Sequence, residues 1–235
     1  MRKYNSEKPL FHIHIPKSAG TTFNKVLDYW FDKNLCPHYF DEENNKMPVK
    51  YDLKPHLCIH GHFNKKRGFG VFDYYPGAEQ FTTIIREPIE LHLSNYFYVK
   101  KNVIKNENYR AGLIQDFKWK SVDDYLEKTN SFLLLHFPWE LTAYNFKEIL
   151  EMNFIHIGIM ENLQESIAIL AKRLGKKNLA VGMENVSPRT ETPSPNAIAR
   201  WKERHRLEYA LYEYVKMLSR PIREAASLPV PFRHN

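Results

Sequence analysis

The chain has 235 residues, which is long enough to bury a substantial core and fits one α/β domain with at most a modest insertion. A net charge of +7 and a pI of about 9.2 favour an anionic partner, such as a nucleotide, an acidic glycan, nucleic acid or a lipid surface, without choosing among them. No stretch approaches the roughly 18 apolar residues of a membrane span, and the N-terminus lacks the apolar core of a secretory signal. We therefore expect a cytoplasmic protein.

Two small groups of residues carry little functional signal. Cys36 and Cys58 cannot form a disulfide framework and match no zinc motif, so two free thiols are expected, with a single bridge as the alternative. Lys65, Lys66 and Arg67 form the densest basic run, and a solvated loop is a simpler interpretation of it than a binding site.

Strands and helices alternate along the chain, which predicts an α/β fold with a central, mainly parallel sheet flanked by helices. Apolar or β-branched runs predict strands at Leu10–Ile15, Leu57–His60, Gln80–Ile85 and Phe154–Ile159. Helical patterns predict helices at Thr22–Phe31, Pro88–Lys101, Val122–Lys128, about 163–174 and about 196–218. We expect one domain over residues 1–235, with an irregular helical insertion or lid at about 102–145.

The segment Pro16–Thr22, with the sequence PKSAGTT, joins the first predicted strand to the first predicted helix. Free N–H groups at a helix N-terminus, together with the helix dipole, favour a phosphate at such a junction. Gly20 lets the backbone approach a ligand closely, and Lys17 supplies a mobile cation. Thr21 and Thr22 offer hydroxyls in addition to their N–H groups. The alternative is an ordinary strand–turn–helix junction with a solvated lysine.

This loop lacks the order of a Walker A motif, in which G-x-x-x-x-G-K-[ST] places the lysine beside the serine or threonine. Here Lys17 precedes Gly20, and no first glycine opens the motif. The strand that would supply a magnesium-binding Asp in an NTPase ends instead in Arg86. We therefore expect a P-loop-like phosphate site that works without a metal ion.

Arg86 follows the predicted strand Gln80–Ile85 at its carboxyl end, where open α/β sheets bind ligands. An anion would stabilise a guanidinium there, and the planar fork of arginine matches a phosphate. Ser94 lies about two turns into the next predicted helix and can add a hydroxyl. The alternative is that Arg86 pairs with Glu87 and only braces the turn.

Together these segments resemble sulfotransferase family 2, which includes the heparan sulfate and chondroitin uronosyl 2-O-sulfotransferases. The resemblance rests on three motifs in family order: HIPKSAGTTF at 14–23, HGHF at 60–63 and IIREPIELHLSNYFY at 84–98. Fainter similarities are YRAGL at 109–113, IGIME at 157–161, NVSPR at 185–189 and EYALYEY at 208–214. The joint pattern spans most of the chain and is far more specific than any one motif.

The resemblance implies an enzyme that uses the sulfate donor PAPS, releases PAP and needs no metal. It implies that the 5′-phosphosulfate is surrounded by the loop residues Lys17, Ser18, Ala19, Gly20, Thr21 and Thr22. It places the 3′-phosphate at Arg86 and Ser94, under a late loop that contains Ser187, Arg189 and Thr190. The chain departs from the family at Leu91, where members commonly carry Arg, and at Ser18, where they carry Thr.

Sulfuryl transfer needs a base for the acceptor's hydroxyl proton and a cation at the leaving phosphate. By the match to the family motif, His62 is the expected general base, with His60 assisting it or contacting the acceptor, and Lys17 is the expected cation. We expect His60 and His62 at an exposed turn after a short strand. His12 and His14 lie on a strand covered on both faces and are expected to pack within the structure. A His-Gly-His sequence alone makes a weak zinc site.

A candidate acceptor surface beside the donor site comprises Tyr96, Phe97, Tyr98, Lys100, Lys101 and Arg110. Aromatic faces stack on sugar rings and cations attract acidic glycans, so a carbohydrate acceptor is expected, mainly from the family resemblance. The alternative is that half of these residues are core and the rest are solvated. Two other functions fit parts of the sequence: a P-loop nucleotide kinase or other NTPase, and a non-catalytic polyanion-binding protein. Neither a nucleic-acid partner nor a membrane span is expected.

Overall fold

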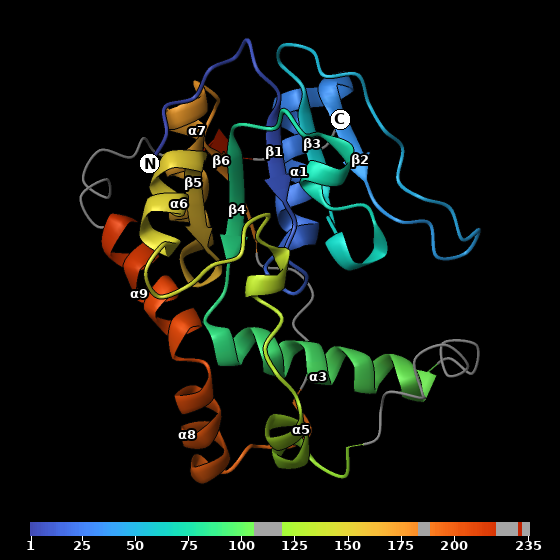
Figure 1. Cartoon of the computed structure of the whole chain (residues 1–235), viewed down its shortest axis with the longest axis vertical. Coiled ribbons are helices and arrows are strands. Elements are labelled where there is room, and N and C mark those ends of the chain that lie inside the picture. The colour runs from blue at the N-terminus through green and yellow to red at the C-terminus, as the bar shows by residue number, and fades with distance from the viewer. Residues whose placement is uncertain (106–118, 183–188, 220–229, 232–235) are drawn as a thin grey trace.

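The computed structural model of the chain describes residues 1–105, 119–182, 189–219 and 230–231. Five parallel strands form one sheet in the order β2-β3-β1-β4-β5 (Figure 1). They are β1 (Leu10–Ile13), β2 (Leu35–His38), β3 (Cys58–Gly61), β4 (Phe81–Ile85) and β5 (Phe154–Ile159). A separate parallel pair joins β6 (Leu179–Ala180) to β7 (Val230–Pro231). The predicted α/β fold with a mainly parallel sheet is confirmed.

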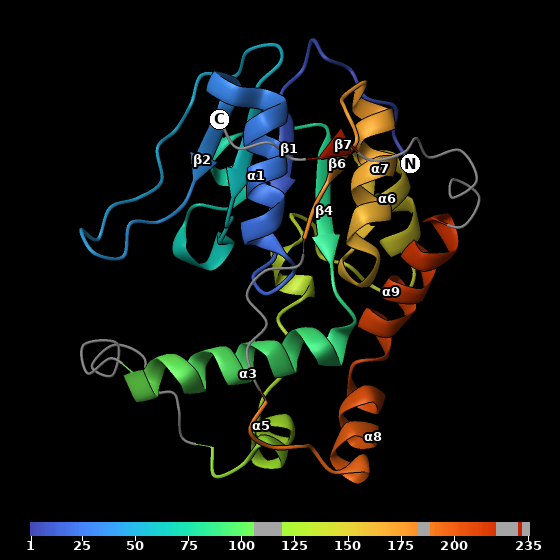
Figure 2. The same ribbon diagram turned by 180° about the vertical axis from the view of Figure 1, so that it is seen from behind.

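Helices cover both faces of this sheet, as Figures 1 and 2 show. One face carries α1 (Gly20–Phe31) and α7 (Leu163–Leu174), and the other carries α6 (Phe146–Asn153) and α9 (Arg206–Ser219). Every residue of β1, β3, β4 and β5 is buried, as expected for parallel strands covered on both sides. The side chains of the sheet enter two apolar cores, one on each face.

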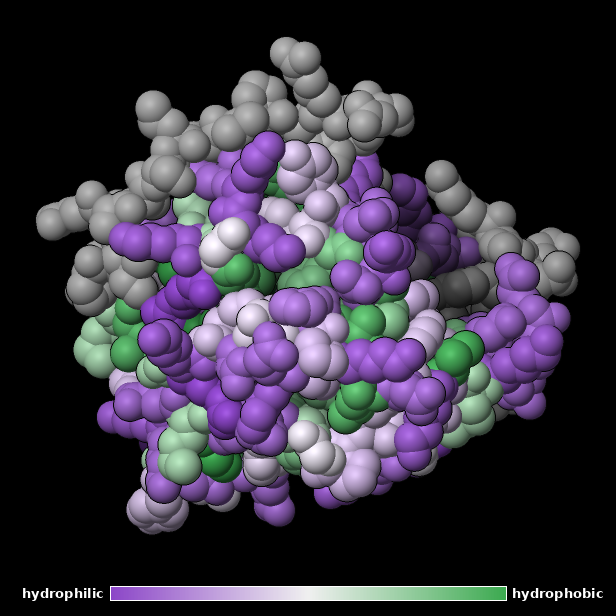
Figure 3. Space-filling view, turned by 90° about the horizontal axis from the view of Figure 1, so that it is seen from above, coloured by the Kyte–Doolittle hydropathy of each residue, from purple (hydrophilic) through white to green (hydrophobic). Residues whose placement is uncertain are grey.

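A third group of helices lies beyond the carboxyl ends of the strands. Helix α3 (Pro88–Lys105) crosses beneath the sheet, and α5 (Val122–Lys128) and α8 (Pro195–Arg204) pack against it (Figure 1). The opposite end of the molecule, seen in Figure 3, is largely hydrophilic with small, scattered apolar groups. The carboxyl edge of the sheet therefore faces α3, and this edge is where parallel sheets bind ligands.

Short elements complete the described chain. They are α2 (Val71–Tyr74) and the 3-10 turns η1 (Asp32–Asn34), η2 (Lys65–Arg67), η3 (Leu134–His136) and η4 (Met160–Asn162). Across the described ranges, no helix has the length and apolar character needed to cross a bilayer. Cys36 and Cys58 are buried free thiols on the neighbouring strands β2 and β3.

The prediction of one terminal helix over about 196–218 is wrong, because α8 and α9 are separate helices that meet at His205. Its ring Nδ1 lies 2.7 Å from the Trp201 carbonyl oxygen, and its backbone N–H donates to the Lys202 carbonyl. The Ser131 N–H donates to the other ring nitrogen at 3.0 Å. The side chain thus takes the carbonyl that an unbroken helix would use, and no Gly or Pro marks the break in the sequence.

The described part of the predicted insertion, residues 119–145, packs onto the body of the protein. Leu133, Phe137 and Leu141 are buried in the apolar core on the α9 face of the sheet. The sequence analysis missed strand β2, because it has four residues and contains Pro37, which is typical of an edge strand. The role of the segment as a lid stays a prediction.

Candidate functional site

The loop between β1 and α1 has an unusual backbone. Lys17 and Ala19 adopt left-handed conformations with φ of 67° and 60°, which costs about 1–2 kcal/mol for each side chain that is not glycine. Between them Ser18 is buried, and its hydroxyl has no hydrogen-bond partner among the described residues. At the start of α1, Thr21 is exposed and Thr22 is buried. A strained turn around an unsatisfied hydroxyl at a helix N-terminus is typical of a ligand-binding loop.

Gly20 is required by a close approach rather than by its own backbone angle. A Cβ added at this position would lie 1.7 Å from Nε2 of His14. The imidazole of His14, just past β1, therefore rests directly on the first turn of α1. Through His14, the loop is therefore in contact with the histidine cluster that also contains His60 and His62.

Arg86, just past β4, reaches the same loop. Its Nη1 donates a hydrogen bond of 3.3 Å to the Lys17 carbonyl oxygen. The Lys17 ammonium lies 3.8 Å above the ring of Tyr98 on α3. Burial, followed by the positive charges of Arg86 and Lys101, lowers the pKa of Lys17. The two cations that sequence analysis predicted for separate phosphates thus lie side by side at one edge of the sheet.

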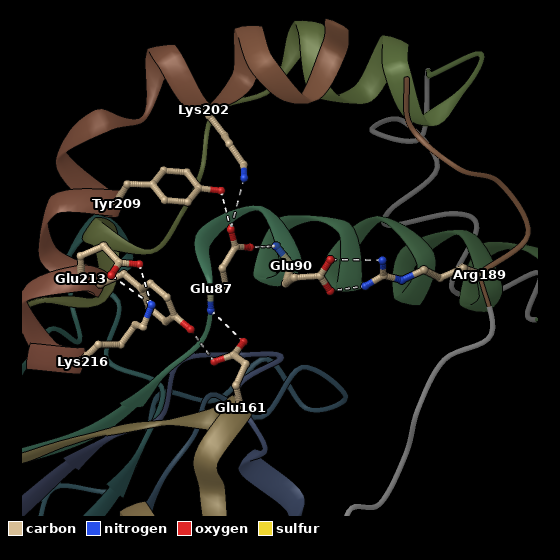
Figure 4. A network of polar contacts seen from close by, with 9 residues as sticks. Glu87, Glu90, Glu161, Arg189, Lys202, Tyr209, Glu213 and Lys216 are labelled. Carbon is tan, nitrogen blue, oxygen red and sulfur yellow. Dashed lines mark hydrogen bonds and ion pairs between the residues drawn. The ribbon is translucent and has the colours of Figure 1, made fainter. Parts of the chain in front are cut away.

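Arg86 does not pair with Glu87, as the alternative interpretation supposed. Its partner is Glu90, at 3.5 Å and one turn into α3. Arg189 forms a second ion pair with Glu90, through two hydrogen bonds (Figure 4). Thr190 is exposed beside Arg189, and Ser187 lies outside the described residues. The predicted 3′-phosphate ligands Arg86 and Arg189 therefore converge on a single carboxylate.

Glu87 is occupied by a different set of partners, which hold the start of α3 in place (Figure 4). Its carboxylate accepts a hydrogen bond of 2.7 Å from the Tyr209 hydroxyl of α9. Its backbone N–H donates to Glu161, which also accepts from the Tyr212 hydroxyl at 3.1 Å. These contacts fix the turn that carries Arg86 against α9. Ser94 lies further along α3 and is half-buried.

The histidines of the HGHF motif are more buried than the predicted exposed turn. His60 belongs to β3 and is only 1% exposed, so its placement at an exposed turn is wrong. A Cβ on Gly61 would lie 1.9 Å from the His38 carbonyl oxygen, so close packing of β2 against β3 explains the glycine. Tyr39, which sequence analysis missed, links His60 to His14. Its hydroxyl lies 2.7 Å from His60 Nε2 and 2.9 Å from His14 Nδ1.

His62 stands at the edge of this cluster. Its ring centroid is 4.5 Å from that of His14, and its Nε2 atom is buried with no hydrogen-bond partner among the described residues. Burial lowers the pKa of His62 to about 4, that of His60 to about 3 and that of His14 to about 2. All three imidazoles are therefore neutral at neutral pH. A neutral imidazole with a free nitrogen can accept a proton.

His12 lies on β1, opposite His60 on β3, and is buried. It packs against Phe23, with 4.6 Å between the ring centroids, as the sequence analysis expected. Among the described residues, no three His, Cys, Asp or Glu side chains group in a way that could hold a metal ion.

A pocket of about 700 Å³ opens beside His62. It extends from Pro16 in the loop and Asn95 on α3 to the segment 132–141. Its aromatic wall comprises Tyr39, Phe40, Phe63, Phe69, Phe132, Phe137 and Trp139. Its polar residues include Glu42, Lys65, Lys66, Arg67 and His136. The basic run predicted as a solvated loop is exposed, and it also forms part of this pocket.

The acceptor surface predicted on α3 is largely absent. Tyr96 and Phe97 are 1% and 3% exposed and belong to the core between α3, α5 and α8. Lys100 is paired with Glu191, and only Tyr98 of the aromatic residues is exposed. Arg110 lies outside the described residues. The helical period of α3 turns two of its three consecutive aromatic residues inward, which a count of aromatic residues does not reveal.

A strand–loop–helix turn with neighbouring arginines, at the carboxyl edge of a parallel sheet, is typical of α/β proteins that bind a phosphorylated ligand. No family model matches the chain. In sequence it is similar to the uronyl 2-sulfotransferases of Homo sapiens and Mus musculus, with 24% identity over 175 residues in each case. Each match covers 60% of this chain and 43% of the relative, so the chain spans less than half the length of these curated relatives.

Among solved structures, the alignment with mouse sulfotransferase SULT7A1 complexed with PAP covers 86% of this chain and 65% of that one. The two are 15% identical, with a TM-score of 0.43. The resemblance predicted from the three motifs is confirmed as a distant sequence similarity to sulfotransferases.

Proposed function

We propose that the chain is a PAPS-dependent sulfotransferase that moves a sulfuryl group to an acceptor hydroxyl. The observation that carries the proposal is the contact between Arg86 and the Lys17 carbonyl, which joins a phosphate-type loop to a second cation. PAPS carries anionic groups at both its 5′ and 3′ positions, so it needs two neighbouring anion sites. The distant similarity to uronyl 2-sulfotransferases supports the same function.

The residues present fit such a donor. The buried Ser18 hydroxyl lacks a partner among the described residues, and Lys17 offers a partly buried cation beside it. We assign the 5′-phosphosulfate to the loop residues Lys17, Ser18, Ala19, Gly20, Thr21 and Thr22. We assign the 3′-phosphate to Arg86 and Ser94, with Arg189, Thr190 and the undescribed Ser187 closing over it. Arg86 and Arg189 already bind one carboxylate between them, as they would a phosphate.

In the proposed reaction, the acceptor oxygen forms a bond to sulfur as the bond from sulfur to the 5′-phosphate oxygen breaks. His62 takes the hydroxyl proton, because its imidazole is neutral at neutral pH and its Nε2 is free to accept. Lys17 stabilises the negative charge that develops on the leaving phosphate. His60 acts through Tyr39 rather than on the acceptor, because it is buried in β3 and hydrogen-bonded to that hydroxyl.

The pocket beside His62 is the proposed acceptor site, in place of the surface on α3. Its aromatic wall offers faces on which a sugar ring can stack, and Lys65 and Lys66 offer charges to an acidic group. Two contacts hold Arg67 in place. Its guanidinium carbon lies 3.7 Å from the ring centroid of Phe40, and its Nη1 lies 2.7 Å from Oε1 of Glu42. A carbohydrate acceptor, preferably an acidic one, fits this combination.

Calorimetry with PAP and with ADP, each with and without magnesium, tests the donor assignment. We expect metal-independent PAP binding in the micromolar range or tighter, with ADP much weaker because it lacks the 3′-phosphate. Magnesium-dependent binding that does not distinguish PAP from ADP would indicate an NTPase. A steep salt dependence with no nucleotide preference would indicate a polyanion-binding protein.

A transfer assay with labelled PAPS over glycans, lipids and small alcohols then tests the reaction. His62→Ala is expected to abolish transfer while PAP binding survives, because the base does not contact the nucleotide. Lys17→Ala is expected to impair both. Normal turnover in the His62 variant would remove that residue from the mechanism.

A further inference from the structure

The pocket wall carries two histidines with unsatisfied ring nitrogens. His62 follows β3, and His136 ends η3 in the segment that covers the α9 face of the sheet. Within the described chain, His62 Nε2 and His136 Nδ1 are both buried and lack a hydrogen-bond partner. Each such atom costs about 1–3 kcal/mol unless a ligand or water satisfies it.

Other buried imidazoles share this property but not this position. The described residues His12, His38, His60 and His156 each have one unpartnered ring nitrogen, and none of them lines the pocket. Unsatisfied nitrogens deep in a sheet are explained by packing alone. His62 and His136 differ from these four because their residues line the pocket, where the polar group of a ligand can satisfy the buried nitrogens.

Burial disfavours the charged form of both pocket histidines. Burial lowers the pKa of His136 to about 4, and the positive charge that His62 would carry lowers it further. Burial likewise lowers the pKa of His62 to about 4. Both rings are therefore neutral at neutral pH, and each offers one N–H donor and one lone pair. The other groups facing His62 are His14 and Tyr39, through ring contacts of 4.5 and 4.9 Å.

We propose that His136 is a second catalytic residue, which holds the reacting hydroxyl of the acceptor together with His62. The hydroxyl donates its hydrogen to Nε2 of His62 and accepts a hydrogen bond from the N–H at Nδ1 of His136. This inference rests on the proposed sulfotransferase function and adds the residue that orients the nucleophile.

The chemistry of a hydroxyl matches this pair of nitrogens. It has one hydrogen and two lone pairs, so one lone pair remains for attack on sulfur after both contacts are made. As the oxygen–sulfur bond forms, the proton passes to His62, while His136 stays neutral because a second adjacent positive charge is unfavourable. A carboxylate has no hydrogen to give to the His62 lone pair. The pair therefore selects an alcohol over an acid group at the reacting position.

A crystal structure of the PAP-loaded chain, alone and soaked with an unsulfated heparosan tetrasaccharide, tests the geometry. We expect one oxygen, from water or from a sugar hydroxyl, within about 3.2 Å of both His62 Nε2 and His136 Nδ1. Rings that turn apart, or nitrogens that bond to protein groups instead, would overturn the inference. A chain that fails to bind PAP refutes the proposed function itself, whereas PAP binding without the shared oxygen refutes only the role of His136.

Two variants of His136 test the same contact in solution. His136→Ala is expected to lower transfer by about 100-fold with PAP affinity unchanged, using the acceptor found by the screen, or water as the acceptor in PAPS hydrolysis. His136→Asn keeps an N–H near the position of Nδ1 and is expected to recover most of this loss. His56→Asn, at an exposed position with a φ of 65° that Asn tolerates, is the control. Transfer by His136→Ala within twofold of the unaltered chain, or no recovery in His136→Asn, contradicts the proposal.

Discussion

Mild acid is expected to unfold this protein, because several buried histidines must stay neutral in the folded state. His60, His92 and His156 are at most 4% exposed, and burial lowers the pKa of each to about 3. In an unfolded chain the same imidazoles have a pKa near 6.5. Unfolding therefore takes up protons between these values. The stability is fully present above the unfolded pKa and is lost as the pH falls below about 6.5.

The size of the effect follows from the pKa shifts. Lowering the pH from 6.5 to 5 costs each of the three groups about 2 kcal/mol, at roughly 1.4 kcal/mol per pH unit. Together they remove about 6 kcal/mol, a large part of the 5–15 kcal/mol that stabilises a typical domain. His62 and His136, each with its pKa lowered to about 4, act in the same direction. We therefore expect the folded state to be lost above about pH 4.

The assay is urea unfolding followed by circular dichroism, repeated between about pH 7.5 and pH 5. His60, His92 and His156 alone are expected to lower the free energy of unfolding by about 4 kcal/mol per pH unit near pH 5. His156→Leu removes one of these protonation sites, whose Nε2 has no partner among the described residues. Its slope should be smaller by about 1.4 kcal/mol per pH unit.

A free energy of unfolding that is the same at both ends of this pH range would refute the reasoning. It would mean that the histidines protonate without unfolding the chain, by drawing in water or by moving to the surface. An unchanged slope in His156→Leu would refute the contribution of that residue alone.

Three further predictions concern the site. Gly20→Ala places a Cβ 1.7 Å from His14 Nε2, so the loop should shift. Calorimetry should then show a PAP affinity that is lower by about tenfold or more. Unaltered affinity would show that His14 moves aside at no cost. Glu90→Gln removes the carboxylate that forms ion pairs with Arg86 and Arg189, so the PAP dissociation constant should decrease several-fold. An increase would mean that Glu90 positions the two arginines for the nucleotide. With the pKa of His62 near 4, kcat/KM should stay level from neutral pH down to about pH 5, above the range in which acid unfolds the chain. A decline centred near pH 6.5 would point to a solvated imidazole instead.

Features that depend on neighbouring residues were predictable from the sequence. The strand Leu10–Ile13 and helix Gly20–Phe31 were predicted to within two residues, because an apolar run and a helical pattern flank the loop directly. The position of Arg86 at a strand end was also predictable, because the β-branched and apolar run before it ends at Ile85. Strand β2 and the break at His205 were missed, since a four-residue edge strand and a side chain competing for a carbonyl leave no periodic signal.

By itself, then, the sequence determined the alternation of strands and helices, the loop Pro16–Thr22 between the first strand and the first helix, and the motif that contains His62. The tertiary structure decided which distant side chains meet: Tyr39 with His14, and Arg86 with Glu90 rather than with the adjacent Glu87. It also decided burial, which makes the motif histidines neutral and leaves a pocket beside His62, whereas Tyr96 and Phe97 of the predicted acceptor surface are in the core. Both depend on how separate elements pack in space, and hydrophobic periodicity within one element carries no information about that packing.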